Sequence, residues 1–220
     1  VYVLNDAVAG VYGEKIFGDG RGYRNLVYIT ISTGVGGGVI VDDHLLIGKQ
    51  GNAHEIGHIV VNYDSNIRCG CGGTGHWEAY AGGANIPRLT QTLAREYGGL
   101  DTDAWREALE KGIEPPKLFQ YYREGDRFAE IVVEEIIRAS IAGLSTIINL
   151  YDPELVTIGG SVFLNNIDIL YKPLIDGVEK HLVTDKPLIK PTRLGSDITL
   201  YGALALAIKP PKTLLEIQGQ

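Results

Sequence analysis

The stretch from His54 to Glu78 constrains the fold of this chain more than any other. It places three histidines, two cysteines and two glutamates among glycines within twenty-five residues. Four of these side chains predict a tetrahedral zinc site, since structural Zn²⁺ sites take four Cys or His ligands and leave no open position. They are His58, Cys69, Cys71 and His76. The alternative is that the two cysteines are inert thiols.

Glu55 and Glu78 flank the four candidate ligands and are not needed to bind the ion. No Lys or Arg occurs between Lys49 and Arg68, so no anion site is predicted there. Carboxylates held near one another without basic neighbours are suited to hydrogen bonds with neutral hydroxyls, as in a sugar. The alternative is a pair of solvated surface glutamates.

The composition narrows the class of protein. Lys and Arg total 20 against 27 acidic residues, so the net charge of −7 predicts no basic surface for nucleic acid or anionic lipid. No apolar run approaches the roughly 20 residues that span a bilayer. Two cysteines one residue apart cannot form a disulfide framework, which favours a reducing compartment. We therefore expect a cytoplasmic protein with no nucleic-acid or membrane partner.

Apolar periodicity predicts one α/β domain. Strands are expected at 1–4, 26–33, 35–41, 44–47, 59–61 and 155–158, and the runs from 26 to 47 form a meander. Helices are expected at 7–17, 77–81, 86–97, 101–111, 115–124, 126–150 and 198–208. Within them, Gly143 indicates close packing against another backbone. Pro173 is expected to split a helix that starts near 162, and the tail from Lys209 is expected to be loose.

Three segments at strand ends each have two interpretations. At Asn5–Asp6 one residue is expected to cap the next helix, although a carboxylate there also suits a ligand crevice; position alone favours the cap. The glycines from Gly34 to Gly38 leave backbone amides open to a phosphate, or simply allow a tightly packed hairpin. Gly159–Gly160 holds part of a nucleotide, or forms a tight βα turn.

Four separated motifs resemble the ROK family of sugar kinases and related repressors. The run from Ile31 to His58 (ISTGVGGGVIVDDHLLIGKQGNAHEIGH) and the later CGCGGTGHWE carry most of the likeness. Asn5–Asp6–Ala7 and the run from Asp152 to Val162 (DPELVTIGGSV) resemble two further family blocks in the same order. The likeness covers nearly the whole chain.

The resemblance implies an actin-like, ribonuclease-H-like ATPase fold, of which residues 1–220 would be the larger C-terminal lobe with a zinc-binding loop. The family's first phosphate loop, an Asp-Gly-Gly-Thr block, is absent from the sequence. Val1 in place of Met and the apolar opening also indicate a lost N-terminal part. We therefore expect a preceding ATPase lobe to be missing, and the chain to be inactive by itself.

The resemblance also implies roles for individual residues. Asp6 would be the catalytic base, which outweighs the capping interpretation. The sugar-binding positions would be Asn5, Glu55, His58 and Glu78. Thr33–Gly34 would approach the ATP phosphates and Gly159–Gly160 the adenosine. His58 would also bind zinc with Cys69 and Cys71.

The implied reaction is ATP- and Mg²⁺-dependent phosphorylation of a hexose, glucose first, at its primary hydroxyl, by a homodimer. The alternatives are a kinase for fructose, mannose or an N-acetylhexosamine, and a sugar-sensing repressor without kinase activity. Two residues depart from the family pattern. His76 replaces the third zinc cysteine, and His54 replaces a small residue, so its ring is expected to crowd or to extend the sugar pocket.

Overall fold

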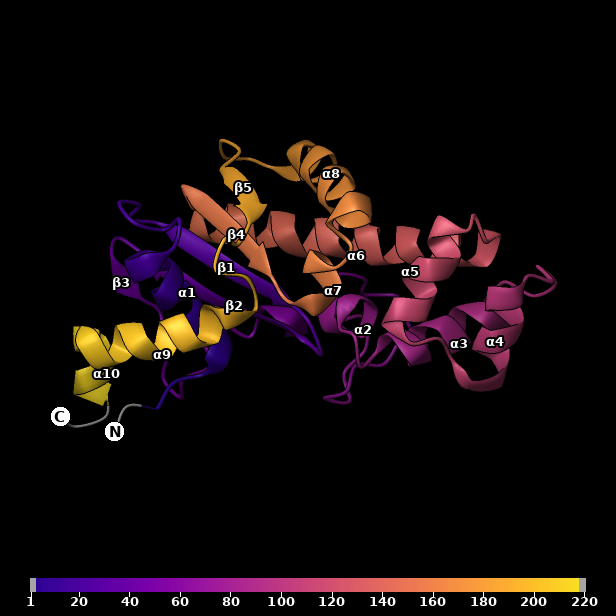
Figure 1. Cartoon of the computed structure of the whole chain (residues 1–220), viewed down its shortest axis with the longest axis horizontal. Coiled ribbons are helices and arrows are strands. Elements are labelled where there is room, and N and C mark those ends of the chain that lie inside the picture. Colours follow the sequence, from indigo (N-terminus) through magenta and orange to yellow (C-terminus); the bar gives the residue numbers. More distant parts are fainter. Residues whose placement is uncertain (1–2, 218–220) are drawn as a thin grey trace.

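The protein is built on a single five-stranded sheet (Figure 1). The computed structural model describes residues 3–217. The strands are β1 (Leu26–Ile31), β2 (Val35–Val41), β3 (His44–Leu45), β4 (Leu155–Gly159) and β5 (Leu188–Pro191), in the order β3-β2-β1-β4-β5. The first three form the expected antiparallel meander, whereas β1, β4 and β5 are parallel. The long segment from 46 to 154 therefore returns to the centre of the sheet.

Helices cover both faces of this sheet and extend beyond its end. The helices of the described residues are α1 (Asp6–Phe17), α2 (Trp77–Ala81), α3 (Ile86–Glu96), α4 (Asp103–Lys111), α5 (Pro115–Arg123), α6 (Arg127–Tyr151), α7 (Ser161–Leu164), α8 (Ile167–Val178), α9 (Ile198–Ile208) and α10 (Lys212–Ile217). The described part of the chain also has three 3₁₀ turns, η1 (Ile56–His58), η2 (Glu179–His181) and η3 (Gly195–Asp197). Within residues 3–217, no helix combines the length and apolar character needed to cross a membrane.

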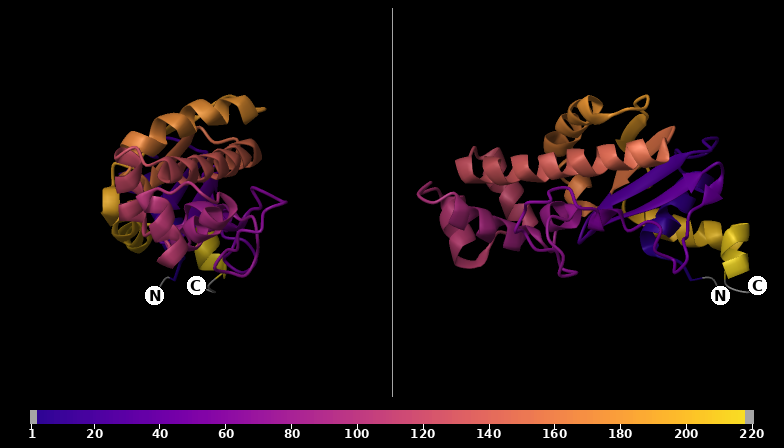
Figure 2. Two further views of the ribbon diagram at one scale, coloured as in Figure 1. Left: turned by 90° about the vertical axis from the view of Figure 1, so that its right-hand side faces the viewer. Right: turned by 180° about the vertical axis from the view of Figure 1, so that it is seen from behind.

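The central strand β1 separates two hydrophobic cores. Val27, Ile29 and Ile31 face the core built with α6 and α8, whereas Leu26 and Tyr28 face α1 and α9. This alternation follows from the two-residue period of a strand, with both faces buried. Figure 2 shows α6 running along one side of the molecule and α9 on the other, with the helices α3 to α5 beyond the end of the sheet.

Several expectations were wrong in detail. Residues 1–2 lie outside the described part, and Val3 and Leu4 are not in a strand. At 59–61 only an isolated bridge forms, between Val60 and His76. The segment 212–217 is helical rather than loose, because Leu214 of α10 is buried in the core beside α1.

Two residues inside helices also behave differently from expectation. Gly143 packs against the indole of Trp77 rather than a backbone, since a Cβ there would lie 2.4 Å from the ring. Pro173 does not split its helix but lies within α8, and the break falls earlier, between α7 and α8. Burial of Leu170 and Leu174 on either side of Pro173 outweighs the lost backbone hydrogen bond.

Helices α1 and α9 cross at two glycines. A Cβ on Gly13 would lie 2.8 Å from the amide nitrogen of Gly202, and a Cβ on Gly202 would lie 2.2 Å from the carbonyl oxygen of Ala9. Because backbone cannot yield as a flexible side chain can, the two helices can approach this closely only without side chains at the crossing. This contact holds α1 against α9.

Replacing Gly202 by Ala should therefore destabilise the protein. Alanine favours a helix, but the clash with the Ala9 carbonyl should cost about 1–3 kcal/mol of unfolding free energy. Urea unfolding followed by circular dichroism measures the change. Gly98→Ala is the matched control, because nothing lies within 4 Å of its added Cβ. Equal stability of both variants would contradict the proposed close crossing.

Candidate functional site

A cavity of ≈ 550 Å³ lies where β1 and β4 end and α1 begins. We call it the central cavity. Its lining includes Asn5, Asp6, Tyr28, Thr30, Ser32, Thr33, Gly34, His54, Glu55, Glu78, Gly160, Ser161 and Asn165. The parallel pairing of Thr30 with Gly159 brings both strands to the same edge, where ligand crevices of α/β sheets form.

Asn5 and Asp6 take one each of the two positions considered for this segment, the cap of the helix and the carboxylate at the crevice. Asn5 is the N-cap of α1, because its side-chain oxygen accepts hydrogen bonds from the N–H groups of Ala7 (2.9 Å) and Val8 (3.4 Å). Asp6 occupies the first helical position and is exposed at the cavity. One of its oxygens accepts the Ala7 N–H at 2.8 Å. The carboxylate is thus held where helix dipoles favour negative charge.

The glycines of β2 serve mainly to let other elements approach. A Cβ on Gly36 would lie 3.3 Å from the Ala7 Cβ, and one on Gly38 would lie 2.7 Å from the Ala7 carbonyl. On the opposite face, a Cβ on Gly37 would lie 2.4 Å from Ile56. The packed-hairpin interpretation therefore holds for these three glycines, although Gly36 also lines the cavity.

The turn after β4 also has a structural reason for glycine. Gly160 has φ +88°, and a Cβ there would lie 2.4 Å from the Ile31 carbonyl. Gly159 makes room for the hydroxyl of Tyr28, 2.7 Å from its added Cβ. This is the tight βα turn that the sequence left open, and Gly160 nevertheless borders the cavity. The hydroxyls of Ser32 and Ser161 link the loops after β1 and β4 at 3.2 Å.

Glu78 connects the cavity wall with the cysteine-rich loop. It lies in the first turn of α2. Its Oε2 accepts the N–H of Val35 at 3.0 Å, and its Oε1 accepts the S–H of Cys69 at 3.3 Å. Gly34 is needed at this point, since a Cβ there would lie 2.4 Å from the same carboxylate. Glu78 is therefore fixed by its partners and is not a solvated surface residue.

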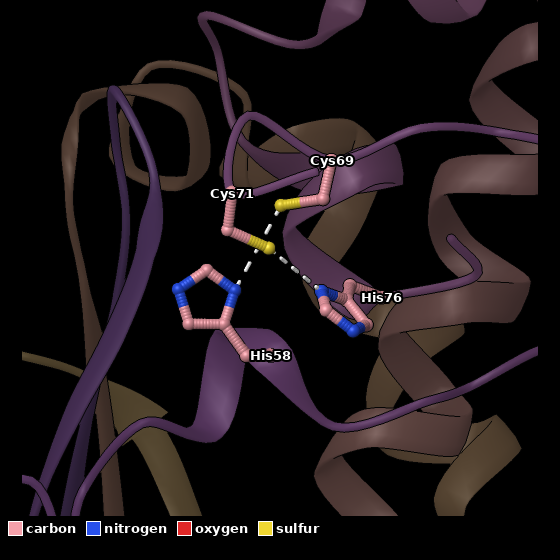
Figure 3. Close-up of side chains that lie close together, drawn as sticks. All are labelled: His58, Cys69, Cys71 and His76. Atoms are coloured by element: carbon pink, nitrogen blue, oxygen red, sulfur yellow. Dashed lines mark hydrogen bonds between the residues drawn. The ribbon is translucent and has the colours of Figure 1, made fainter. Parts of the chain in front are cut away.

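The four predicted metal ligands converge on one point (Figure 3). One donor atom from each of His58, Cys69, Cys71 and His76 lies within 4.8 Å of all the others. The Cys71 Sγ is 3.3 Å from the His76 Nδ1, and the Cys69 Sγ is 3.8 Å from the His58 Nδ1. Ligand atoms of a tetrahedral zinc site are separated by about 3.3–3.8 Å. The donor set and these two distances suit one Zn²⁺ ion, and any larger separation, up to 4.8 Å, would have to shorten on binding.

The ligand group is partly buried, and this affects its chemistry. Burial raises the pKa of the Cys69 thiol to about 11. A metal ion must therefore displace a proton from this thiol at neutral pH, and zinc affinity should fall as the pH falls. Glu55 lies beside the same group, with its Oε2 3.5 Å from the His58 Nε2.

Removing one donor should release the metal. We expect Cys69→Ser to lower the zinc content of the purified full-length protein from about one ion per chain to a small fraction of it. Atomic absorption after gel filtration measures the loss. His44→Ala is the control, since His44 is exposed and hydrogen-bonded only locally. Undiminished zinc in the Cys69 variant would contradict this ligand set.

Tyr28 is a cavity residue that the sequence reasoning missed. Its ring lies over α1 at Gly10, where a Cβ would approach the ring to 2.7 Å, between Asp6 and the fully buried Glu14. Burial, helped by these two carboxylates, raises the pKa of Tyr28 to about 12. The two-residue period of β1 puts Tyr28 and Thr30 on the face toward α1, which was the available signal.

The structure brings together most of the residues singled out from the sequence. Those that line the central cavity are Asn5, Asp6, Thr33, Gly34, Glu55, Glu78 and Gly160. His58 and Gly159 are adjacent but not part of its lining. Among the lining residues in the described part of the chain, three are carboxylates and none is Lys or Arg. Such a surface suits neutral hydroxyls, and phosphates there require a cation.

The sequence model that defines the ROK family matches residues 1–210 of this chain. A glucokinase of Aeropyrum pernix is 45% identical over 221 residues, which cover 97% of this chain and 68% of that protein. A xylose repressor of Caldicellulosiruptor bescii is 30% identical over 173 residues, 76% of this chain and 43% of the repressor.

Solved structures give the same result. A ROK hexokinase from Thermus thermophilus superposes with a TM-score of 0.81 at 29% identity, covering 98% of this chain and 65% of that one. A ROK family glucokinase from Streptomyces griseus, in complex with glucose and AMPPNP, has a TM-score of 0.74 at 31% identity, covering 93% and 67%. The mixed α/β fold thus matches the sugar kinases of this family, and the chain spans about two thirds of their length.

Proposed function

The chain belongs to the ROK family, and from this premise we propose that its protein transfers the γ-phosphoryl group of ATP to the primary hydroxyl of a hexose, glucose first. The observation that carries the proposal is the central cavity. It combines Asp6 and the carboxylates of Glu55 and Glu78 with the Thr33–Gly34 turn. The glucokinase relatives, and the Streptomyces griseus glucokinase whose structure contains glucose and AMPPNP, support the same assignment.

Asp6 is the general base of the proposed reaction. Its carboxylate takes the proton of the sugar hydroxyl while the hydroxyl oxygen attacks the γ-phosphorus and the bond to the ADP oxygen breaks. Anchoring by the first turn of α1 supplies the fixed orientation that phosphoryl transfer needs. Mg²⁺ bound to ATP supplies the charge neutralisation that the cavity's own residues lack.

The sugar is held by the side chains of Asn5, Glu55, His58 and Glu78 in this proposal. Two oxygens of Glu78 already accept one hydrogen bond each, and each retains further acceptor capacity. The phosphates approach the backbone of Thr33–Gly34, and adenosine lies toward Gly159–Gly160. Thr33, Gly34 and Gly160 line the central cavity, which supports this placement of the nucleotide.

Zinc is a structural brace in the same proposal. An ion bound by His58, Cys69, Cys71 and His76 would hold the loop from 59 to 76 against η1 and α2. Its binding to the Cys69 thiolate would remove the S–H that Glu78 now accepts. That carboxylate oxygen would then be available to a sugar hydroxyl. The brace and the substrate site would thus meet at Glu78, which lies beside Cys69 and lines the central cavity.

We assign the part of the ATP site that residues 1–220 do not supply to a lobe that precedes them in the full-length protein. The relatives are about half as long again as the matched region. An exposed apolar face of α9, with Leu200 70%, Leu204 48% and Ile208 63% accessible, lies at the end of the molecule near both termini and suits packing against further polypeptide (Figure 1). Residues 1–220 alone are expected not to phosphorylate sugar. The homodimer and the cytoplasmic location stay predictions.

A sugar-responsive repressor is the second candidate, because xylose repressors occur among the relatives. Asp6 at the cavity favours the kinase, since a sensor needs no base. Hexose phosphorylation and operator DNA binding, both assayed on the full-length protein, separate the two. The same assay with fructose, mannose and N-acetylhexosamines identifies the sugar.

Asp6→Asn should lower kcat for glucose phosphorylation by the full-length protein by about 10²–10⁴-fold, because the amide cannot take the proton. The KM for glucose should change little, since the amide keeps the shape of the side chain. A coupled assay for ADP release measures both constants. Asp64→Asn, in an exposed loop outside the central cavity, is the control. Equal kcat in the wild type and Asp6→Asn would refute the assignment of Asp6.

A further inference from the structure

His54 is a buried imidazole in the wall of the central cavity. Only 3% of its surface is exposed, and it belongs to the cavity lining beside Glu55. Its Nε2 lies 2.6 Å from the carbonyl oxygen of Gly51. A carbonyl only accepts hydrogen bonds, so Nε2 carries the proton in this contact. In the neutral ring, Nδ1 is then an acceptor with a free lone pair.

The Nδ1 atom has no partner among residues 3–217. The Gly51 contact is the one hydrogen bond made by this side chain there. Yet Nδ1 is not among the fully enclosed polar atoms without a partner in that region, which are the hydroxyls of Thr157 and Thr184. It therefore keeps a small accessible surface, and the open space beside His54 is the central cavity.

The ring is held by its loop as well as by burial. The N–H of Ala53 donates to the Ile47 carbonyl at 3.1 Å, and the N–H of Ile56 donates to the His54 carbonyl at 2.7 Å. The acceptor is therefore pre-positioned just before η1, whose N-cap residue is Glu55. Pre-positioned polar groups of this kind decide between closely related ligands.

We infer that His54 is a specificity-determining residue that accepts, through Nδ1, a hydrogen bond from one hydroxyl of the bound hexose. This inference rests on the proposed function. A hexose without that hydroxyl would leave Nδ1 unpaired in a buried site. A hexose with a bulky group at that position would meet the ring. His54 thus selects sugars in which this hydroxyl is present and unsubstituted.

A thermodynamic cycle tests the inference. Binding of glucose and of each monodeoxyglucose is measured by calorimetry on the full-length wild type and on His54→Gln. Glutamine can still donate an amide N–H toward Gly51 but has no acceptor at the Nδ1 position. One monodeoxyglucose should bind the wild type about 3- to 10-fold more weakly than glucose. That penalty should vanish in His54→Gln, while the penalties of the other deoxy sugars persist.

Two further variants make the result decisive. His54→Asn places an amide oxygen near the Nδ1 position, so it should keep the penalty even if the glutamine variant folds poorly. His44→Gln, at an exposed histidine outside the cavity, should leave every penalty unchanged. If the protein phosphorylates glucose but every deoxy sugar shows the same loss of affinity in the wild type and in His54→Gln, the role of His54 is overturned and the proposed function stands. Failure of the wild type to bind any hexose would overturn the proposed function as well.

Discussion

The hydrogen bonds of Glu78 hold the site together. This carboxylate joins the N–H of Val35, at the start of β2, to the thiol of Cys69 in the loop that carries the metal ligands. It also requires the missing side chain at Gly34. Because Val35, Cys69 and Glu78 belong to the sheet, the loop and α2, these contacts tie one wall of the central cavity to the ligand group. The contact with Val35 would remain if a metal ion displaced the Cys69 proton. A change in the conformation of the loop that carries Cys69 should therefore alter the shape of the central cavity.

A second constraint is the close approach of backbones around α1. Gly36 and Gly38 admit the first turns of the helix against β2, Gly13 and Gly202 admit α9, and Gly10 admits the ring of Tyr28. The helix is consequently fixed on three sides, and its first residue, Asp6, points into the cavity from a rigid support. Proposed catalysis by orientation depends on such rigidity, since small misplacements of a base are costly.

The sequence allowed much of this to be predicted, for identifiable reasons. Apolar periods located the meander and the long helix capped by Asp126, and the spacing of His58, Cys69, Cys71 and His76 identified a ligand group that the fold brings together. Tyr28 was missed because a strand tyrosine looks like ordinary core. The helix break predicted at Pro173 was wrong because helix propensity takes no account of the burial of its neighbours in α8.

By itself the sequence predicted most of the helices and strands and the group of four ligand-type side chains, because periodicity, capping and ligand spacing are local properties. The tertiary structure alone decided which of two adjacent residues caps α1 and which faces the cavity, and that the glycines of β2 serve packing. It also decided that Glu78 couples the metal-ligand loop to β2 and that His54 keeps one free acceptor. These features depend on contacts between distant segments, which no local pattern records.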